Sequence, residues 1–224
     1  PPRQLTRKKN LLLAFDAFDT LFYAKPPMEV QYSNAALRHG IDSNTPTQDP
    51  LAPLVESFTD AFKQEKHKSP NYGKATGLGA EKWWANVTKN TFQPFLKPRQ
   101  KVPQALVSEL YTTFASSKGY TLFPDVLPFF KILRDKATHS SSNPSSPWPW
   151  DRTIVCSISN TDDRVPLVLQ SLGLKVGPRR VGSASSPSDP GLSSDNDIEF
   201  VVLSYDAGFR KPDRRIFDAA THLL

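Results

Sequence analysis

Hydrophobic residues along the chain follow two patterns, one typical of buried strands and one typical of helices. Continuous apolar runs predict strands buried on both faces, as in a parallel sheet, at residues 11–15, 153–158 and 198–203. Apolar residues at helical spacing predict helices at residues 28–39, 51–66, 80–92, 103–115, 124–136, 165–172 and 213–224. Strands that alternate with helices indicate right-handed βαβ units, and hence an α/β fold with a Rossmann-like parallel sheet.

The order of these elements predicts a core and an inserted subdomain. Residues 1–22 and 121–224 contain the predicted strands and are expected to form the α/β core, whereas residues 23–120 are expected to form a helical cap subdomain. Residues 137–150 and 177–197 are rich in Ser, Pro and Gly and are too polar to pack a core. We expect these two stretches to be surface insertions.

Composition narrows the classes of partner. The net charge of +6 over 224 residues is modest, and we interpret the basic residues near the start as a solvated terminus. No apolar run approaches the roughly 18 residues that a membrane span needs, and no nucleic-acid motif is present. The expected partner is therefore a small-molecule substrate, and the Ser- and Pro-rich insertions leave open a protein partner.

The single cysteine, Cys156, lies inside an apolar run. One cysteine excludes a disulfide framework and a cysteine zinc site, and it suits a reducing compartment. The chain begins with Pro1, and its only methionine is Met28. We therefore expect the printed sequence to be part of a longer product that is cytoplasmic or mitochondrial.

Residues that carry chemistry follow each predicted strand. Asp16 follows the first strand. Ser159 and Asn160 follow the second strand, and Lys211 lies in the loop beyond the third. Open α/β sheets bind ligands at the carboxyl ends of their strands, so we expect these side chains to meet in one pocket. The alternative is structural, with an acidic turn at Asp16 and a turn followed by a helix cap at Lys211 and Asp213.

Together these groups suit a site that handles an anion. A carboxylate can attack the substrate, and a hydroxyl can donate a hydrogen bond to a substrate oxygen. An ammonium group can offset negative charge and orient the nucleophile. The sequence therefore predicts nucleophilic chemistry at the edge of the sheet.

The order of the three segments resembles that of the haloacid dehalogenase superfamily of hydrolases. Asp16 matches its first motif, Ser159 its second and Lys211 its third. The helical stretch between Asp16 and Ser159 matches the cap that many members insert after the first strand. A closer likeness, to the subgroup named haloacid dehalogenase-like hydrolase domain-containing protein three and its fungal relatives, is carried by Trp83-Trp84, by the run from Ser159 to Arg164, and by the run from Gly208 to Phe217.

The resemblance implies a phosphatase-type hydrolase that acts on a small phosphorylated metabolite. Asp16 would be the nucleophile and would form an aspartyl-phosphate, with Ser159 and Lys211 completing the catalytic set. Thr20 and Asn160 would contact the substrate phosphoryl group.

The first motif departs from that of the superfamily's phosphatases, which usually reads Asp-x-Asp-Gly-Thr with the second Asp as general acid and base. In this chain Phe18 takes the position of the second Asp, and Asp19 takes that of the glycine. Phenylalanine cannot transfer a proton, and general acid help typically contributes about 10²- to 10⁴-fold. Asp19 lies one residue further along an extended strand, which turns its side chain to the other face. We expect Asp19 to shape the turn.

The resemblance also implies Mg²⁺ as a cofactor, with Asp16 and the backbone carbonyl of Phe18 among its ligands. In the superfamily a fourth motif, usually Gly-Asp with a further acid downstream, supplies more carboxylates. The printed sequence reaches Leu224 without this motif, and Mg²⁺ requires near-octahedral oxygen ligation. We therefore expect either that the core lacks its C-terminal part here or that the metal site has been lost.

Two other functions stay open. Dehalogenases of the superfamily carry an aromatic residue at the position of Phe18 and need no metal, but they also carry an arginine early in the cap, and residues 27–32 contain none. A non-catalytic binding or scaffold protein on the same fold would explain Phe18, the missing fourth motif and the long insertions. Fold alone does not decide among these functions.

Overall fold

A computed structural model describes residues 9–44, 48–140, 150, 152–183 and 195–224. The chain divides into two compact units. The first, here the α/β unit, comprises Pro1–Tyr23, Leu122–Asn160 and Gly173–Leu224. The second, here the helical unit, comprises Ala24–Thr121 and Thr161–Leu172.

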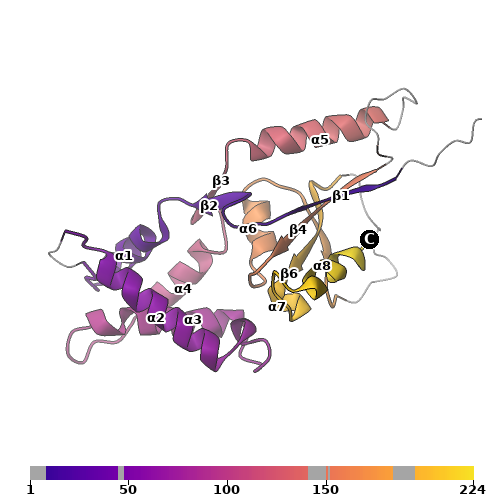
Figure 1. The fold of residues 1–224 in the computed structure, drawn as a ribbon. Coiled ribbons are helices and arrows are strands. Elements are labelled where there is room, and N and C mark those ends of the chain that lie inside the picture. The colour runs from indigo at the N-terminus through magenta and orange to yellow at the C-terminus, as the bar shows by residue number, and fades with distance from the viewer. Residues whose placement is uncertain (1–8, 45–47, 141–149, 151, 184–194) are drawn as a thin grey trace, which may run out of the picture. The chain divides into compact units, whose positions relative to one another are not determined.

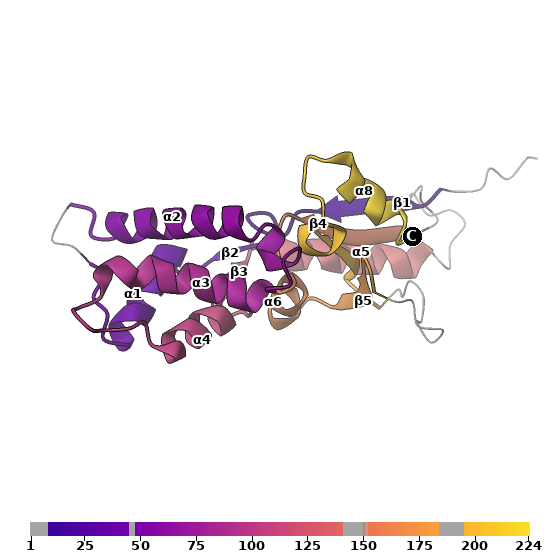
Figure 2. The ribbon, with the colours of Figure 1, turned by 90° about the horizontal axis from the view of Figure 1, so that it is seen from below.

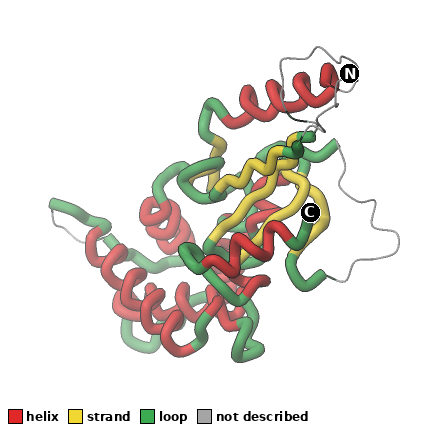
Figure 3. The backbone as a smooth tube through the Cα atoms, turned by 45° about the vertical axis from the view of Figure 1, so that its right-hand side comes forward, coloured by secondary structure: helices red, strands yellow, loops and turns green. Residues whose placement is uncertain are grey.

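Among its described residues, the α/β unit contains a parallel sheet of four strands (Figures 1 and 3). The strand order is β1-β4-β6-β5. The strands are β1 (Leu11–Phe15), β4 (Thr153–Ser159), β5 (Val176–Arg180) and β6 (Ile198–Leu203). The helices of this unit are α5 (Val126–Ser140), α7 (Ser204–Ala207) and α8 (Arg214–Thr221). The α/β fold with a Rossmann-like parallel sheet that the sequence pattern predicts is confirmed.

The sequences of β4 and β6 are continuous apolar runs because nearly all residues of both strands are buried. Every residue of β6 is buried, and so is every residue of β4 after Thr153. Their side chains pack against Ile216 and Ala220 of α8 in one hydrophobic cluster. Strands covered on both faces need apolar residues at successive positions, which is the pattern in the sequence.

β1 differs from its prediction, because it is only partly buried. Among the described strands it pairs with β4 alone, and Ala14 is exposed. The apolar run from Leu11 to Phe15 therefore marks a strand correctly, but the expectation of burial on both faces is wrong for the described part of the sheet. Phe15 is covered on one side by the rings of Phe129 and Phe130 of α5.

β5 (Val176–Arg180) begins one residue before the stretch 177–197, which the composition predicts to be a surface insertion, and its other residues lie inside that stretch. It pairs in parallel with β6, so this end of the predicted insertion belongs to the sheet. Gly177 allows the close approach of β5 to β6, because a Cβ atom there would lie 2.1 Å from the carbonyl oxygen of Glu199.

The other predicted insertion, residues 137–150, also begins inside a regular element, because α5 continues to Ser140. The remainder of both stretches, residues 141–149 and 184–194, lies outside the described residues, and so does most of the proposed partner surface.

The helical unit is built from five α-helices and two short 3-10 helices among the described residues. They are α1 (Met28–Arg38), α2 (Ala52–Lys68), η1 (Asn71–Gly73), α3 (Ala80–Phe92), η2 (Gln93–Phe95), α4 (Gln104–Thr113) and α6 (Val165–Ser171). Helix α3 packs against α2 and α4 (Figure 2). Two short strands, β2 (Phe22–Ala24) and β3 (Tyr120–Leu122), pair where the chain enters and leaves this unit. Neither strand was predicted from the sequence pattern.

Aromatic and aliphatic side chains fill the centre of this unit. Tyr32 of α1 is buried between the rings of Phe58, Phe92 and Phe114. Trp83 of α3 is also buried, and its indole N–H donates to the backbone oxygen of Ser69 at 2.9 Å. Trp83 is therefore a core residue of the helical unit. No helix that the structure describes is both long enough and apolar enough to cross a membrane.

Helix ends follow the local signals in the sequence. Gly40, with φ of 76°, follows α1 and takes the left-handed conformation that suits a residue after a helix. Asp213 caps α8, since its side chain accepts a hydrogen bond from the backbone N–H of Arg215. The helix end predicted at residue 39 and the helix start predicted at residue 213 each lie within one residue of the observed bounds.

The segment Thr161–Leu172 groups with the helical unit, whereas the order of elements predicts that it belongs to the core. The reason is a buried polar cluster. Asp162 accepts two hydrogen bonds from the Arg164 guanidinium and one from the indole N–H of Trp84. The guanidinium lies 4.7 Å from the ring centre of Trp84 and 5.0 Å from that of Tyr111. The contacts of Asp162 and Arg164 with Trp84 and Tyr111 hold the segment against α3 and α4.

Stability at acid pH is expected to depend on Asp162. Burial alone raises the pKa of this carboxyl, but the charge and hydrogen bonds of Arg164 outweigh burial and hold the pKa below its ordinary value. A carboxyl whose pKa is lower in the folded protein stabilises the fold above its unfolded pKa, and this contribution is lost as the pH falls through the folded pKa. As the pH falls below about 4, we expect the free energy of unfolding of the wild type to decrease. We expect a smaller decrease in Asp162→Asn. Urea titrations at several pH values from 7 to 3 measure the free energy of unfolding of each protein. An equal change of this free energy with pH in wild type and Asp162→Asn would contradict the prediction.

Candidate active site

The candidate site lies where three parallel strands of the α/β unit end. Asp16 comes directly after β1, and Ser159 is the last residue of β4. Lys211 lies between α7 and α8, in the chain that follows β6. Residues distant in the sequence therefore meet at the carboxyl edge of the sheet, as expected for an open α/β fold.

Three donors hold the carboxylate of Asp16. One oxygen, Oδ1, accepts hydrogen bonds from the Ser159 hydroxyl at 2.9 Å and from the Ala17 backbone N–H at 2.8 Å. The other, Oδ2, lies 2.6 Å from the Lys211 ammonium nitrogen. The Asp16 side chain nevertheless keeps 41% of its surface exposed. The carboxylate is thus both oriented and accessible, which are the two requirements for a nucleophile.

Lys211 is fixed by the end of β4. Its ammonium group donates to the backbone oxygen of Ile158 at 2.8 Å, in addition to its contact with Asp16. Its backbone N–H donates to the side-chain oxygen of Asn160 at 2.6 Å. The side-chain amide of Asn160 in turn donates to the Lys211 backbone oxygen at 3.1 Å.

The structure therefore brings together the three residues that the sequence assigns to catalysis, Asp16, Ser159 and Lys211. It places Asn160 against the backbone of Lys211, where both amide atoms are used, although the resemblance implies that Asn160 contacts the substrate. Thr20, the other residue with that implied role, is exposed on the turn after β1. The roles of Thr20 and Asn160 as substrate contacts stay predictions.

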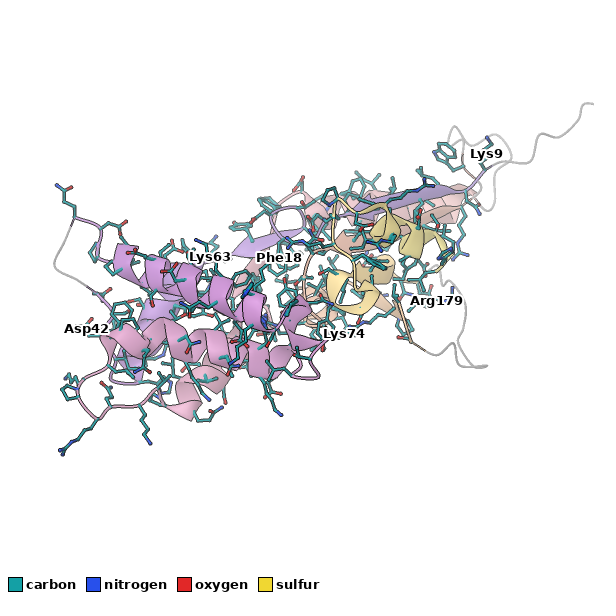
Figure 4. All side chains as sticks on the ribbon, turned by 60° about the horizontal axis from the view of Figure 1, so that its bottom comes forward. Lys9, Phe18, Asp42, Lys63, Lys74 and Arg179 are labelled. Carbon is teal, nitrogen blue, oxygen red and sulfur yellow. The ribbon has the colours of Figure 1, made fainter. Side chains whose placement is uncertain are left out.

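Phe18 and Asp19 form the turn that follows Asp16. The Phe18 ring, labelled in Figure 4, is 36% exposed and meets the buried ring of Phe22 edge-on at 4.7 Å. Asp19 has a φ of 54°, in the left-handed region, and its N–H donates to the backbone oxygen of Phe22 at 2.8 Å. Its side chain is exposed. Asp19 therefore shapes the turn, as one-residue spacing along the strand suggests.

Comparison with known proteins identifies the family. No family model matches the chain. An uncharacterized hydrolase of Schizosaccharomyces pombe is 28% identical over 213 residues, which are 95% of this chain and 73% of that protein. Haloacid dehalogenase-like hydrolase domain-containing protein 3 of Xenopus laevis is 30% identical over 212 residues, which are 95% of this chain and 70% of that protein. The chain belongs to the haloacid dehalogenase-like hydrolases.

Among solved structures, one similar to this chain is that of a haloacid dehalogenase-type hydrolase of Bacillus subtilis bound to magnesium. It has 13% sequence identity and a TM-score of 0.46, and the match covers 97% of this chain and 73% of that one.

The described residues do not by themselves fit the Mg²⁺ that the family resemblance implies. Within the described ranges, no group of three or more His, Cys, Asp or Glu side chains is placed to hold a metal ion. Of the ligands that the resemblance implies, the described residues supply the Asp16 carboxylate, which also accepts from Ser159, Ala17 and Lys211, and the backbone carbonyl of Phe18. A near-octahedral Mg²⁺ site needs more oxygen ligands than this, so no chemical step is assigned to the metal.

Other parts of this haloacid dehalogenase-like site could not be found from the sequence. The Ala17 N–H and the Ile158 carbonyl both contact site residues, but a backbone group leaves no signal in residue identity. The position of Asn160 directly after Ser159 was the only available sign of its contact with Lys211. Cys156 is fully buried in β4, and this burial raises the pKa of its thiol to about 12, so the thiol is a poor nucleophile.

Proposed function

We propose that this protein is a hydrolase of phosphatase type in which Asp16 attacks a small phosphorylated metabolite. The observation that supports the proposal most directly is the Asp16 carboxylate, held by Ser159 and Lys211 yet open to solvent. A carboxylate with this support is a suitable nucleophile.

The reaction has two steps. A carboxylate oxygen of Asp16 forms a bond to phosphorus while the bond from phosphorus to the leaving oxygen breaks, and the leaving group departs with the electron pair. Water then attacks the phosphorus of the aspartyl-phosphate while the bond from phosphorus to the Asp16 oxygen breaks. This step restores the carboxylate and releases inorganic phosphate, and the proton of the attacking water passes to solvent. The Ser159 hydroxyl and the Lys211 ammonium are the donors that stabilise the charge on the phosphoryl oxygens in both steps.

Phe18 restricts the leaving group. No proton donor is present at that position, so a leaving alkoxide must depart unprotonated, whereas a nitrophenolate is stable without a proton. General acid help is typically worth about 10²- to 10⁴-fold, and we expect turnover of 4-nitrophenyl phosphate to exceed that of a simple alkyl phosphate by more than this factor. Measured kcat/KM values across a series of aryl and alkyl phosphates test the expectation.

A gain-of-function variant gives the sharper form of this test. Phe18→Asp restores a carboxyl group and is expected to raise kcat/KM for an alkyl phosphate more than that for 4-nitrophenyl phosphate. Phe18→Asn is the matched control, because it has nearly the same shape as Asp but cannot supply the proton. Equal changes in both variants would show that polarity at this position, and not proton transfer, controls the rate. Each assay is run with and without added Mg²⁺, which decides whether the implied cofactor is needed.

A second candidate function is dehalogenation of a 2-haloacid, and Phe18 is the observation that favours it. A halide leaves without protonation, so the missing acid carries no penalty for this reaction. Chloride release from 2-chloropropionate by wild type, compared with Asp16→Asn, tests it directly. Release at the background rate in both proteins would remove this candidate, and a lack of turnover in both assays would favour a binding protein.

A further inference from the structure

Asn160 and Lys211 are joined by two hydrogen bonds of opposite direction. The Asn160 side-chain oxygen accepts from the Lys211 backbone N–H at 2.6 Å, and its side-chain nitrogen donates to the Lys211 backbone oxygen at 3.1 Å. A primary amide can bond both the N–H and the C=O of one residue because it offers an acceptor and a donor side by side. The contact spans 51 positions in the sequence, so it joins the end of β4 to the loop between α7 and α8.

The consequence for Lys211 follows from its surroundings. Lys211 lies between α7 and α8, outside any helix or strand. Its ammonium reaches Asp16 only if its backbone is held at the end of β4, and the two Asn160 bonds hold it there, with the Ile158 carbonyl fixing the far end of the side chain. A lysine side chain has many rotamers, so an unanchored backbone would spread the ammonium over many positions.

We propose that Asn160 is a positioning residue, which acts on the reaction through Lys211 and does not contact the substrate. The catalytic part of this proposal rests on the proposed function. Misplacing a reacting group by about 1 Å can cost roughly 100-fold in rate. Removal of the Asn160 amide is therefore expected to lower kcat roughly 10- to 100-fold, with the fold and Asp16 itself intact.

Backbone amide exchange tests the contact without any need for activity. In wild type the Lys211 N–H is bonded to Asn160 and is expected to exchange slowly with deuterium. In Asn160→Ala its exchange is expected to become at least tenfold faster, while amides of the sheet core keep their rates. Asn90→Ala, at an exposed position on α3, is the matched control and should leave the Lys211 rate unchanged. Equal Lys211 rates in wild type and Asn160→Ala would overturn the proposal.

A double-mutant cycle tests the catalytic part. Hydrolysis of 4-nitrophenyl phosphate is measured for wild type, Asn160→Ala, Lys211→Met and the double variant. If Asn160 acts through Lys211, the double variant has the same kcat as Lys211→Met, because the position of a missing ammonium no longer matters. If Asn160 binds substrate or only stabilises the fold, the two losses multiply, and the proposal is wrong. A wild-type protein without turnover would overturn the proposed function and this catalytic role, while the exchange result would still decide whether the contact exists.

Discussion

Asp16→Asn is expected to lower kcat for 4-nitrophenyl phosphate by about a thousandfold or more. The amide is nearly the same size as the carboxylate but is not a nucleophile, so the aspartyl-phosphate does not form. Loss of a covalent nucleophile typically leaves only the rate that binding and charge stabilisation provide. Acid-quenched mass spectrometry should find a phosphoryl group on Asp16 in wild type and none in the variant.

Asp19→Asn is the matched control for this prediction, since it removes the same charge three positions away. Asp19 is exposed on the turn and contributes its backbone N–H to Phe22, so we expect a change of less than about threefold in kcat. A loss as large as that of Asp16→Asn would instead identify Asp19 as the missing general acid. Equal rates in wild type and Asp16→Asn would end the proposal of Asp16 as nucleophile.

Arg164→Met is expected to lower the free energy of unfolding of the helical unit by about 3–5 kcal/mol. Methionine replaces part of the side-chain volume but leaves the Asp162 carboxylate buried without its cation, and removal of one partner of a buried ion pair typically has this cost. The Asp162 side chain is 1% exposed and that of Arg164 is 11% exposed. Urea unfolding followed by tryptophan fluorescence suits the measurement, because Trp83 and Trp84 both lie in this unit.

An exposed pair in the same unit provides the control. Arg38 pairs with Glu109 at the surface, where the side chains are 58% and 33% exposed. Ion pairs in this setting typically contribute less than about 1 kcal/mol, so Arg38→Met should change the free energy of unfolding by no more than that. Similar losses in the two variants would mean that burial does not set the strength of the Asp162–Arg164 pair.

Local patterns in the sequence were sufficient for most elements of the fold and for the central residues of the site. The buried strands β4 and β6 and the helices could be predicted because the spacing of apolar residues reflects which face of an element is covered. Asp16 and Ser159 could be predicted because each lies at the carboxyl end of an apolar run that marks a strand, and parallel strands end at the same edge. Lys211 could be placed near the same edge because it lies in the loop beyond β6, and the resemblance to a known family added its expected catalytic role.

Contacts between distant residues determined the rest. The partial exposure of β1 depends on which strands flank it, and the pairing of β5 depends on the room that Gly177 leaves beside Glu199. The segment after Asn160 joins the helical unit because Asp162 and Arg164 meet Trp84 and Tyr111. Asn160 holds Lys211 through backbone atoms that every residue has. Periodicity in a sequence reports the environment of each element, but it does not report which element or which backbone group provides that environment, and only the folded chain brings those partners together.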